Sequence, residues 1–341
     1  MEKDVNFKDI FTRSGAQYLV YDLGRRVQPI DNNLFHTIEQ GQAAYPHPVQ
    51  GHAHIGFIFW HHISEPFMCF FKLPLDTQSC INMEAKLAIV QHIHQQFKHD
   101  LTQELSQEQQ EQLGQLPFVF KPPQDKLASL HAQISYQLKQ APSQYYQEVV
   151  TYFEHHDTQQ KWENLGLQGL ADFCVRMTQH HDVNQISQSL DRLPEALFEA
   201  FCHQIEHIQI PSHLAQALWE ILQKTQIKSI QNACLRGLSS DVAYSTQAVT
   251  YLLNDTVELD HLIIIGARHE YALAQPELRQ RYLNAIAEQD PHVFEKLFCE
   301  LLALPLLKHS LHRELAQLSP SSLVGRAVCQ LNQQLLERST A

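Results

Sequence analysis

Histidine is the residue type in this 341-residue chain whose number and spacing most invite a chemical reading. The chain carries 22 histidines, and two adjacent pairs, His155-His156 and His180-His181, are each followed by an aspartate. Helical metal-dependent phosphohydrolases use a distant His, a His-Asp pair and a later Asp, because a divalent ion needs imidazole nitrogens together with carboxylate oxygens. The order of the residues fits such a metal site, with these ligands: His156 first, His181 and Asp182 as the pair, and Asp241 or Asp255 last.

A second histidine pattern suits a strand. His52 and His54 alternate, so in a strand both imidazoles point to one face and can share a metal. Adjacent histidines diverge in either structure, and in a helix His92 and His94 point about 200° apart. A chain with 22 histidines contains doublets by chance. We therefore predict no cofactor and assign no catalytic, cofactor-binding or metal-ligating residue, and we keep the phosphohydrolase set as the alternative.

Other catalytic and ligand-binding signatures are absent from the sequence. It contains no GxGxxG, GxxxxGK[ST], GxSxG or HExxH motif and no set of kinase motifs. Arg25-Arg26 follows a glycine turn and has the chemistry to clamp a phosphate, but such a pair also suits a hairpin edge. The formal charge is −12, and residues 100–225 hold 16 acidic side chains against 7 basic ones. This charge repels phosphate backbones, so we do not expect nucleic-acid binding.

The cysteines and the hydropathy pattern bear on the cellular compartment. The seven cysteines are an odd number, none forms a CxxC pair, and several lie among Leu and Phe. This pattern is typical of reduced thiols in the core of a cytoplasmic protein. No run approaches the ~18 apolar residues of a membrane helix, and the start of the chain, Met1-Glu2-Lys3-Asp4, lacks the apolar region of a secretion signal. The expected location is the cytoplasm.

The first 121 residues are predicted to form a small α/β domain with β-hairpins. A β-rich run over residues 18–22 turns at Leu23-Gly24 into residues 25–27, which predicts one hairpin. The aromatic runs 54–60 and 67–71 flank a short polar turn and predict a second. Asn32-Asn33 is expected to cap a short helix with Leu34, Phe35 and Ile38 on one face, and residues 79–113 to form a long helix.

Residues 122–341 are predicted to form an all-α helical array. Amphipathic segments of 12–15 residues follow one another, with apolar residues at helical spacing. Proline is tolerated in the first turn of a helix, and it precedes or opens several segments: Leu193-Pro194, Ile210-Pro211, Gln275-Pro276, Asp290-Pro291 and Ser319-Pro320. Asp290 and Ser319 are expected to act as N-caps. Starts every 14–20 residues, near 195, 212, 226, 241, 257, 277, 292, 306 and 321, predict either a HEAT-like repeat array or an irregular helical domain.

Several segments give the chain a resemblance over essentially its whole length. They are Tyr21-Asp-Leu-Gly-Arg-Arg-Val27, Phe59-Trp60, Glu65-Pro66 with Phe71-Lys-Leu-Pro-Leu-Asp76, and Trp162 with Leu165-Gly-Leu-Gln-Gly-Leu-Ala-Asp172. On these residues the chain resembles an uncharacterised gammaproteobacterial family of ~340-residue proteins, classed only as a domain of unknown function. The resemblance implies a cytoplasmic bacterial protein and carries no catalytic residue over.

Together these observations predict an α+β fold that is predominantly α. A curved helical array offers a long surface without built-in chemistry, so the expected function is non-catalytic protein–protein interaction, as an adaptor for unknown protein partners. Neither a membrane nor a nucleic acid is an expected partner. The alternative is the metal-dependent phosphohydrolase.

Overall fold

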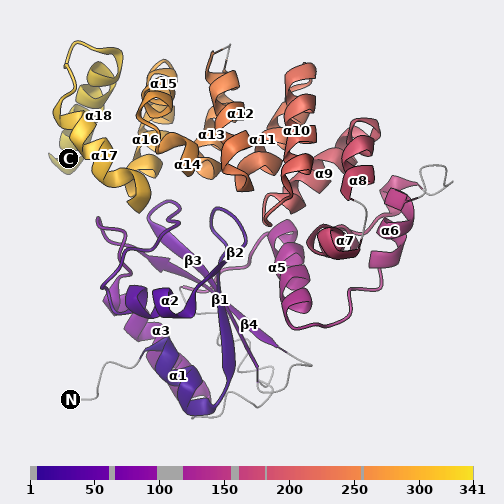
Figure 1. Cartoon of the computed structure of the whole chain (residues 1–341). Helices are drawn as coiled ribbons and strands as arrows, with labels where there is room; N and C mark the ends of the chain where they lie inside the picture. The colour runs from indigo at the N-terminus through magenta and orange to yellow at the C-terminus, as the bar shows by residue number, and fades with distance from the viewer. Residues whose placement is uncertain are drawn as a thin grey trace. The chain divides into compact units, whose positions relative to one another are not determined.

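The chain is divided into two compact units (Figure 1). The first comprises Met1–Leu130 and Gln137–Gln140, and the second comprises His131–Tyr136 and Ala141–Ala341. The structure is a computed structural model, and it describes residues 6–60, 66–97, 118–154, 161–180, 183–254 and 257–340. The fold is α+β and predominantly α, as predicted.

A four-stranded antiparallel sheet forms the centre of the first unit. Its strands are β1 (Gln17–Asp22), β2 (Gln28–Ile30), β3 (His52–Trp60) and β4 (Phe67–Pro74), in the order β2-β1-β3-β4. β3 and β4 pair in the register Phe57↔Cys69, which confirms the predicted aromatic hairpin. The other hairpin is displaced from its prediction. Residues 25–27 are not a strand, and β1 pairs with β2 instead.

One face of the sheet packs against three helices, α1 (Phe7–Ser14), α2 (Asn32–Glu39) and α3 (Met83–Phe97). Alternate residues of β3 point into this core, where Phe57 stacks on Phe7 with ring centroids 4.6 Å apart. The cap of α2 is Asp31, whose carboxylate accepts from two backbone amides. Leu34 was predicted on the buried face of α2, but it is 43% exposed, because α2 packs through Phe35 and Ile38.

A buried polar cluster fixes these three helices. The Lys86 ammonium donates to Asn6 Oδ1 and to the Glu39 carbonyl, each at 2.8 Å. The Glu39 carboxylate accepts from the Phe7 amide at 2.8 Å, and its second oxygen lies 3.0 Å from His36 Nδ1. Burial raises the pKa of Glu39, and the hydrogen bond with His36 opposes that shift. Since buried charges are tolerated when paired, the cluster ties the start of α1 to α2 and α3.

The first part of α5 (Gln124–Gln137) also belongs to the sheet unit. The Lys126 ammonium donates to the Leu23 carbonyl at 2.8 Å and to the Gly24 carbonyl, and Tyr21 donates to the Gln137 side chain at 3.1 Å. The turn after β1 is therefore held by α5. The predicted helix over residues 79–113 is realised as α3, which begins at Met83, and residues 98–117 lie outside the described residues.

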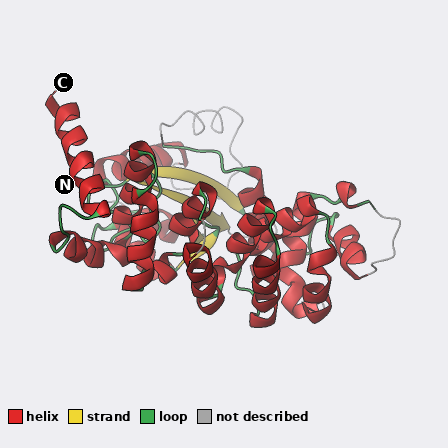
Figure 2. Cartoon of the chain, turned by 90° about the horizontal axis from the view of Figure 1, so that it is seen from above, coloured by secondary structure: helices red, strands yellow, loops and turns green. Residues whose placement is uncertain are grey.

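The regular secondary structure of the second unit is entirely helical in its described residues, and the strands in Figure 2 all belong to the first unit. Its helices are α6 (Tyr146–Glu154), η1 (Trp162–Asn164), α7 (Leu167–His180), α8 (Val183–Ser189), η2 (Leu190–Arg192), α9 (Glu195–Ile205), α10 (Ser212–Lys224), α11 (Lys228–Gly237), η3 (Leu238–Ser240), α12 (Val242–Asn254), α13 (Leu259–Arg268), α14 (Glu270–Leu273), α15 (Pro276–Ala287), α16 (Pro291–Ala303), α17 (Pro305–Ala316) and α18 (Leu323–Thr340).

These helices are stacked in two layers. α8, α10, α12, α15 and α18 pack on one another in that order, and α7, α9, α11, α13 and α16 form the second layer (Figure 1). Each helix thus contacts a helix further along its own layer, and a continuous apolar core lies between the layers. In such stacks, neighbouring helices bury the apolar faces that a single helix would leave in water.

The helix starts follow the sequence signals closely, with one exception. Asp290 caps α16 by accepting from the His292 amide at 2.8 Å. Ser319 does not cap α18. The Ser319-Pro320 turn precedes the helix, and Ser322 accepts from the Gly325 amide at 3.0 Å instead.

The core between the two layers generates a prediction about domain independence. A fragment of residues 122–341 contains this core in full, so it is expected to fold alone, with a strongly helical far-UV circular dichroism spectrum and a cooperative thermal melt. A fragment that is β-rich, or that melts without cooperativity, would contradict the prediction that residues 122–341 contain an independent helical unit.

Candidate functional site

The helical unit has a groove beside α10. It has a volume of about 890 Å³ and is bounded by α8 with η2, by the starts of α9 and α11, and by one face of α10. Its lining residues are Asn184, Ser187, Gln188, Leu190, Asp191, Leu193, Glu195, Phe198, His213, Gln216, Ala217, Glu220, Ile221, Lys224, Thr225, Ile227 and Ile230.

The groove lies on the side of α10 that faces α8 and η2. α8 (Val183–Ser189) continues directly into η2 (Leu190–Arg192), and both contact α10. On the opposite side of α10, Trp219 meets Tyr251 of α12 edge-to-face with ring centroids 5.6 Å apart. The recess therefore lies at the α8 side of α10.

The floor of the groove is apolar and only partly buried. Leu193, Ala217, Ile221 and Ile230 are partly buried side chains packed against the main core. Ile227 precedes α11 and is 52% exposed. Exposed large apolar side chains are unremarkable singly, but this one continues an apolar floor.

The rim of the groove carries more carboxylates than ammonium groups. Asp191, Glu195 and Glu220 are acidic, and Lys224 is the lysine among the lining residues. Glu195 accepts from Ser229, and Glu220 accepts from Gln216 at 3.1 Å and lies 3.6 Å from Lys224. These pairs lie at the surface, where they contribute little to stability.

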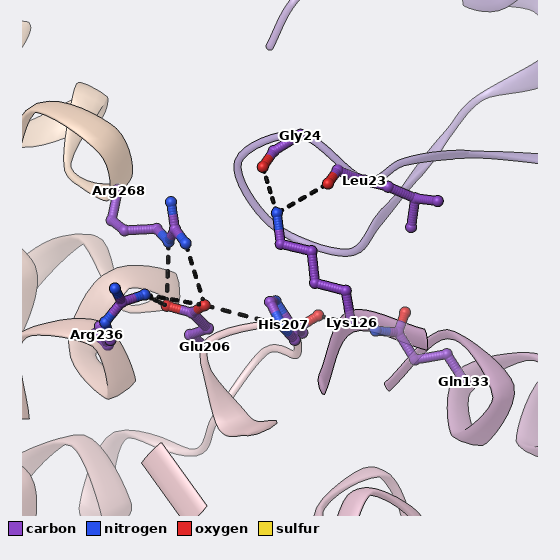
Figure 3. A network of polar contacts seen from close by, with 8 residues as sticks. All are labelled: Leu23, Gly24, Lys126, Gln133, Glu206, His207, Arg236 and Arg268. Atoms are coloured by element: carbon purple, nitrogen blue, oxygen red, sulfur yellow. Dashed lines mark hydrogen bonds and ion pairs between the residues drawn. The ribbon is translucent and has the colours of Figure 1, made fainter. Parts of the chain in front are cut away.

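A buried ion cluster links the second layer close to the end of α9. The Glu206 carboxylate contacts Arg268 with both oxygens, at 3.0 and 3.3 Å, and Arg236 at 3.2 and 3.4 Å (Figure 3). Arg236 and Arg268 lie in the last turns of α11 and α13, where a cation is favoured by the helix dipole. One carboxylate therefore joins three successive helices of the layer.

The lowered pKa of Glu206 shows that its charged form is stabilised by its neighbours. Burial by itself raises the pKa of Glu206, but Arg268, His207 and Arg236 outweigh it and bring the pKa to about 2. His207 Nε2 lies 3.8 Å from the carboxylate, and the His207 carbonyl accepts from Gln133 at 3.2 Å (Figure 3). Both carboxylate oxygens of Glu206 accept from Arg236 and Arg268, so we interpret the cluster as structural.

A second polar pair has the residue types of a nucleophile and a base. Ser245 Oγ and His269 Nδ1 lie 2.6 Å apart, between α12 and the start of α14. Both residues are buried, at 2% and 1% exposure. A substrate cannot reach them, so the pair serves to join the helices.

The predicted metal set falls largely outside the described residues. His156, His181, Asp182 and Asp255 all lie there. Asp241 is described, and its carboxylate caps α12 by accepting from the Ala243 and Tyr244 amides, each at 3.0 Å. Within the described ranges, no group of three or more His, Cys, Asp and Glu side chains is placed to hold a metal ion.

The remaining sequence candidates lie in the sheet unit. His52 Nδ1 lies 2.7 Å from the Gln50 carbonyl. The pKa of His54 is lowered to about 4, first by burial and then by Lys72, so this imidazole is neutral near pH 7. Arg25 is buried and donates to the Pro48 carbonyl at 3.0 Å, which is not the position of a phosphate clamp.

The seven cysteines all lie in the described part of the chain, and none forms a disulfide. Cys174, Cys202 and Cys234 are buried in the core of the second unit, and burial raises the pKa of all three thiols. Neutral buried thiols are poor nucleophiles. Cys299 and Cys329 are exposed, so the expectation of core thiols holds for only part of the set.

The comparison with protein families matches nearly the whole chain. Residues 5–332 match the family described as "Protein of unknown function (DUF3549)", and the chain belongs to that family. No curated protein and no solved structure matches. In the described part of the chain, no helix combines the length and the apolar character needed to cross a membrane.

The sequence did not predict the groove, although α10 carries a signal of it. Apart from the core stripe of Leu214, Leu218 and Leu222, a second set of residues recurs at spacings of three and four and lines the groove: His213, Gln216, Ala217, Glu220, Ile221 and Lys224. Ala217 and Ile221 belong to this second set, so the apolar surface of α10 is wider than its core stripe. The residues of α8, α9 and α11 that complete the recess cannot be read from that pattern.

The ion cluster at Glu206 generates a prediction about pH. The carboxylate has a pKa of about 2 when folded and about 4.3 when unfolded. Its contribution to stability is therefore fully present above about pH 4.3 and is lost as the pH falls toward 2. Glu206→Gln is expected to lower the free energy of unfolding by about 3 kcal/mol at pH 7, and the difference from the wild type should shrink toward pH 2. Urea unfolding followed by circular dichroism measures both, with the exposed Glu277→Gln as control. Equal stability of wild type and Glu206→Gln at pH 7 would refute the assignment.

The position of Asp241 generates a prediction that separates a cap from a metal ligand. Asp241→Ala is expected to cost about 1 kcal/mol of stability, and Asp241→Asn much less, because an amide oxygen still caps the helix. The metal content of protein purified without chelator should be equal in wild type and both variants. The phosphohydrolase hypothesis expects the opposite, namely stoichiometric metal that is lost in Asp241→Ala and in His181→Ala.

Proposed function

We propose that this protein is a non-catalytic adaptor in the cytoplasm, and that its HEAT-like helical array binds a segment of a partner protein. The observation that carries this proposal is the groove beside α10, about 890 Å³ in volume, with an apolar floor and a polar rim. Protein-binding sites of this kind combine an apolar centre that excludes water with polar groups around it.

The internal pairing of the charged residues in the array supports an interaction role. The buried carboxylate of Glu206 contacts residues of neighbouring helices, and the buried pair of Asp172 and Arg176, 3.0 Å apart, contacts Ser143 in the loop before α6 and Ser135 of α5. These charges stabilise the array. The groove in turn offers a surface on which a partner's side chains can be desolvated, which is the main source of binding free energy.

The test compares two variants that each replace an exposed apolar side chain with serine, one inside the groove and one outside it. Ile227→Ser removes the exposed apolar side chain from the groove. Ile227 is also the N-cap residue of α11 and makes no side-chain cap, so serine there is expected to preserve or raise stability. The matched control is Val242→Ser, since Val242 is 54% exposed at the start of α12 and does not line the groove.

The full-length wild type and both variants serve as baits in affinity capture from native cells, with quantitative mass spectrometry of the co-purifying proteins. At least one protein is expected to be retained by the wild type and Val242→Ser and reduced about tenfold or more with Ile227→Ser. Equal thermal melts establish that the loss is not a folding defect. A capture profile that is the same for all three baits would refute the groove as the binding site.

A further inference from the structure

The geometry points to a particular class of occupant for the groove. We infer, on the basis of the proposed adaptor function, that it binds an amphipathic α-helix of net positive charge, supplied by a partner protein. The helix would lie alongside α10, with its apolar face on Ile221, Ile227 and Ile230 and its basic residues toward Asp191 and Glu220.

The shape of the groove favours a helix. It runs along α10, whose lining residues recur at spacings of three and four over the length of the helix: His213, Gln216, Ala217, Glu220, Ile221 and Lys224. A stripe of this spacing is the surface against which a second helix packs. A partner helix beside α10 would cover this stripe as the helices of the array cover those of their neighbours.

The backbone of the groove argues against an extended peptide. An extended segment binds by adding a strand to an open sheet edge, where main-chain amides and carbonyls await partners. The walls of this groove are formed by the helices α8, α9, α10 and α11 with the turns before α9 and α11, and no strand lies among the lining residues. A helical ligand satisfies its own main-chain groups and needs only side-chain contacts from the groove.

The charge of the groove favours a basic ligand. Three carboxylates and one ammonium group line it, and residues 100–225 as a whole carry 16 acidic and 7 basic side chains. Complementary charge at the rim speeds association and rejects acidic partners. The same field disfavours a nucleic acid, whose phosphates would meet Asp191, Glu195 and Glu220.

The test selects ligands without assuming a sequence. A displayed library of random peptides about 16 residues long is selected on the full-length wild-type protein and depleted on Ile227→Ser. The peptides that survive are expected to carry net positive charge and apolar residues at i, i+3 or i+4, and i+7. Peptides of neutral or negative charge, peptides rich in proline, or no peptides at all that depend on Ile227 would overturn the inference.

A second measurement tests the charge directly. The best selected peptide is labelled with fluorescein and titrated by anisotropy against the wild type, against Asp191→Asn/Glu220→Gln, and against the control Glu277→Gln/Glu288→Gln, whose carboxylates are exposed on and just after α15. The rim variant is expected to bind about three- to tenfold more weakly and to lose most of the salt dependence, while the control binds as the wild type does. Equal binding by all three proteins would overturn the charge assignment.

These outcomes separate the inference from the adaptor function. If basic helical peptides bind the groove but no cellular protein depends on Ile227, the adaptor function fails and the class of ligand stands. If a captured partner enters the groove through an acidic or extended segment, the adaptor function stands and the inference fails.

Discussion

The apolar stripe of α10 illustrates the constraint on which the helical unit depends. Leu214, Leu218 and Leu222 are fully buried, and α10 packs against α8, α11 and α12. An isolated helix of 13 residues is marginal in water, so α10 exists because its neighbours cover this stripe. The same holds for each helix of the two layers, and it makes the stack, and not any single helix, the unit of stability.

Buried charge contributes to this stack at the ends of its helices. Glu206 joins the ends of α9, α11 and α13, and Arg279 of α15 pairs with Glu314 of α17 while donating to the Leu273 carbonyl at 2.8 Å. The bond from Arg279 satisfies a carbonyl that the end of α14 leaves unpaired. The ion pairs of Glu206 join residues that are 30 and 62 positions apart in the sequence. Apolar stripes fix which faces meet, and these ion pairs fix how the ends are aligned.

Sequence patterns predicted the local elements well because the signals for them are local. Asp290-Pro291 marks the start of α16 by a cap and a proline, and the aromatic runs of β3 and β4 form the predicted hairpin. The displaced strand β2 and the exposed Leu34 show where such signals fail, because pairing partners and buried faces are chosen by the whole unit. The groove and the Glu206 cluster were beyond prediction for the same reason. Both depend on contacts between separate helices, which the local pattern of any one helix does not contain.

The groove leaves part of the apolar surface of the stack uncovered. α10 contacts α8, η2, α11 and α12, yet Ala217 and Ile221 on its groove face are only partly buried, and Ile227 beside them is 52% exposed. Apolar area left in water costs free energy that a ligand can recover by covering it. A partner helix on this face would bury these side chains in the way that the helices of the array bury those of their neighbours, and this is the physical reason for the binding role that we propose.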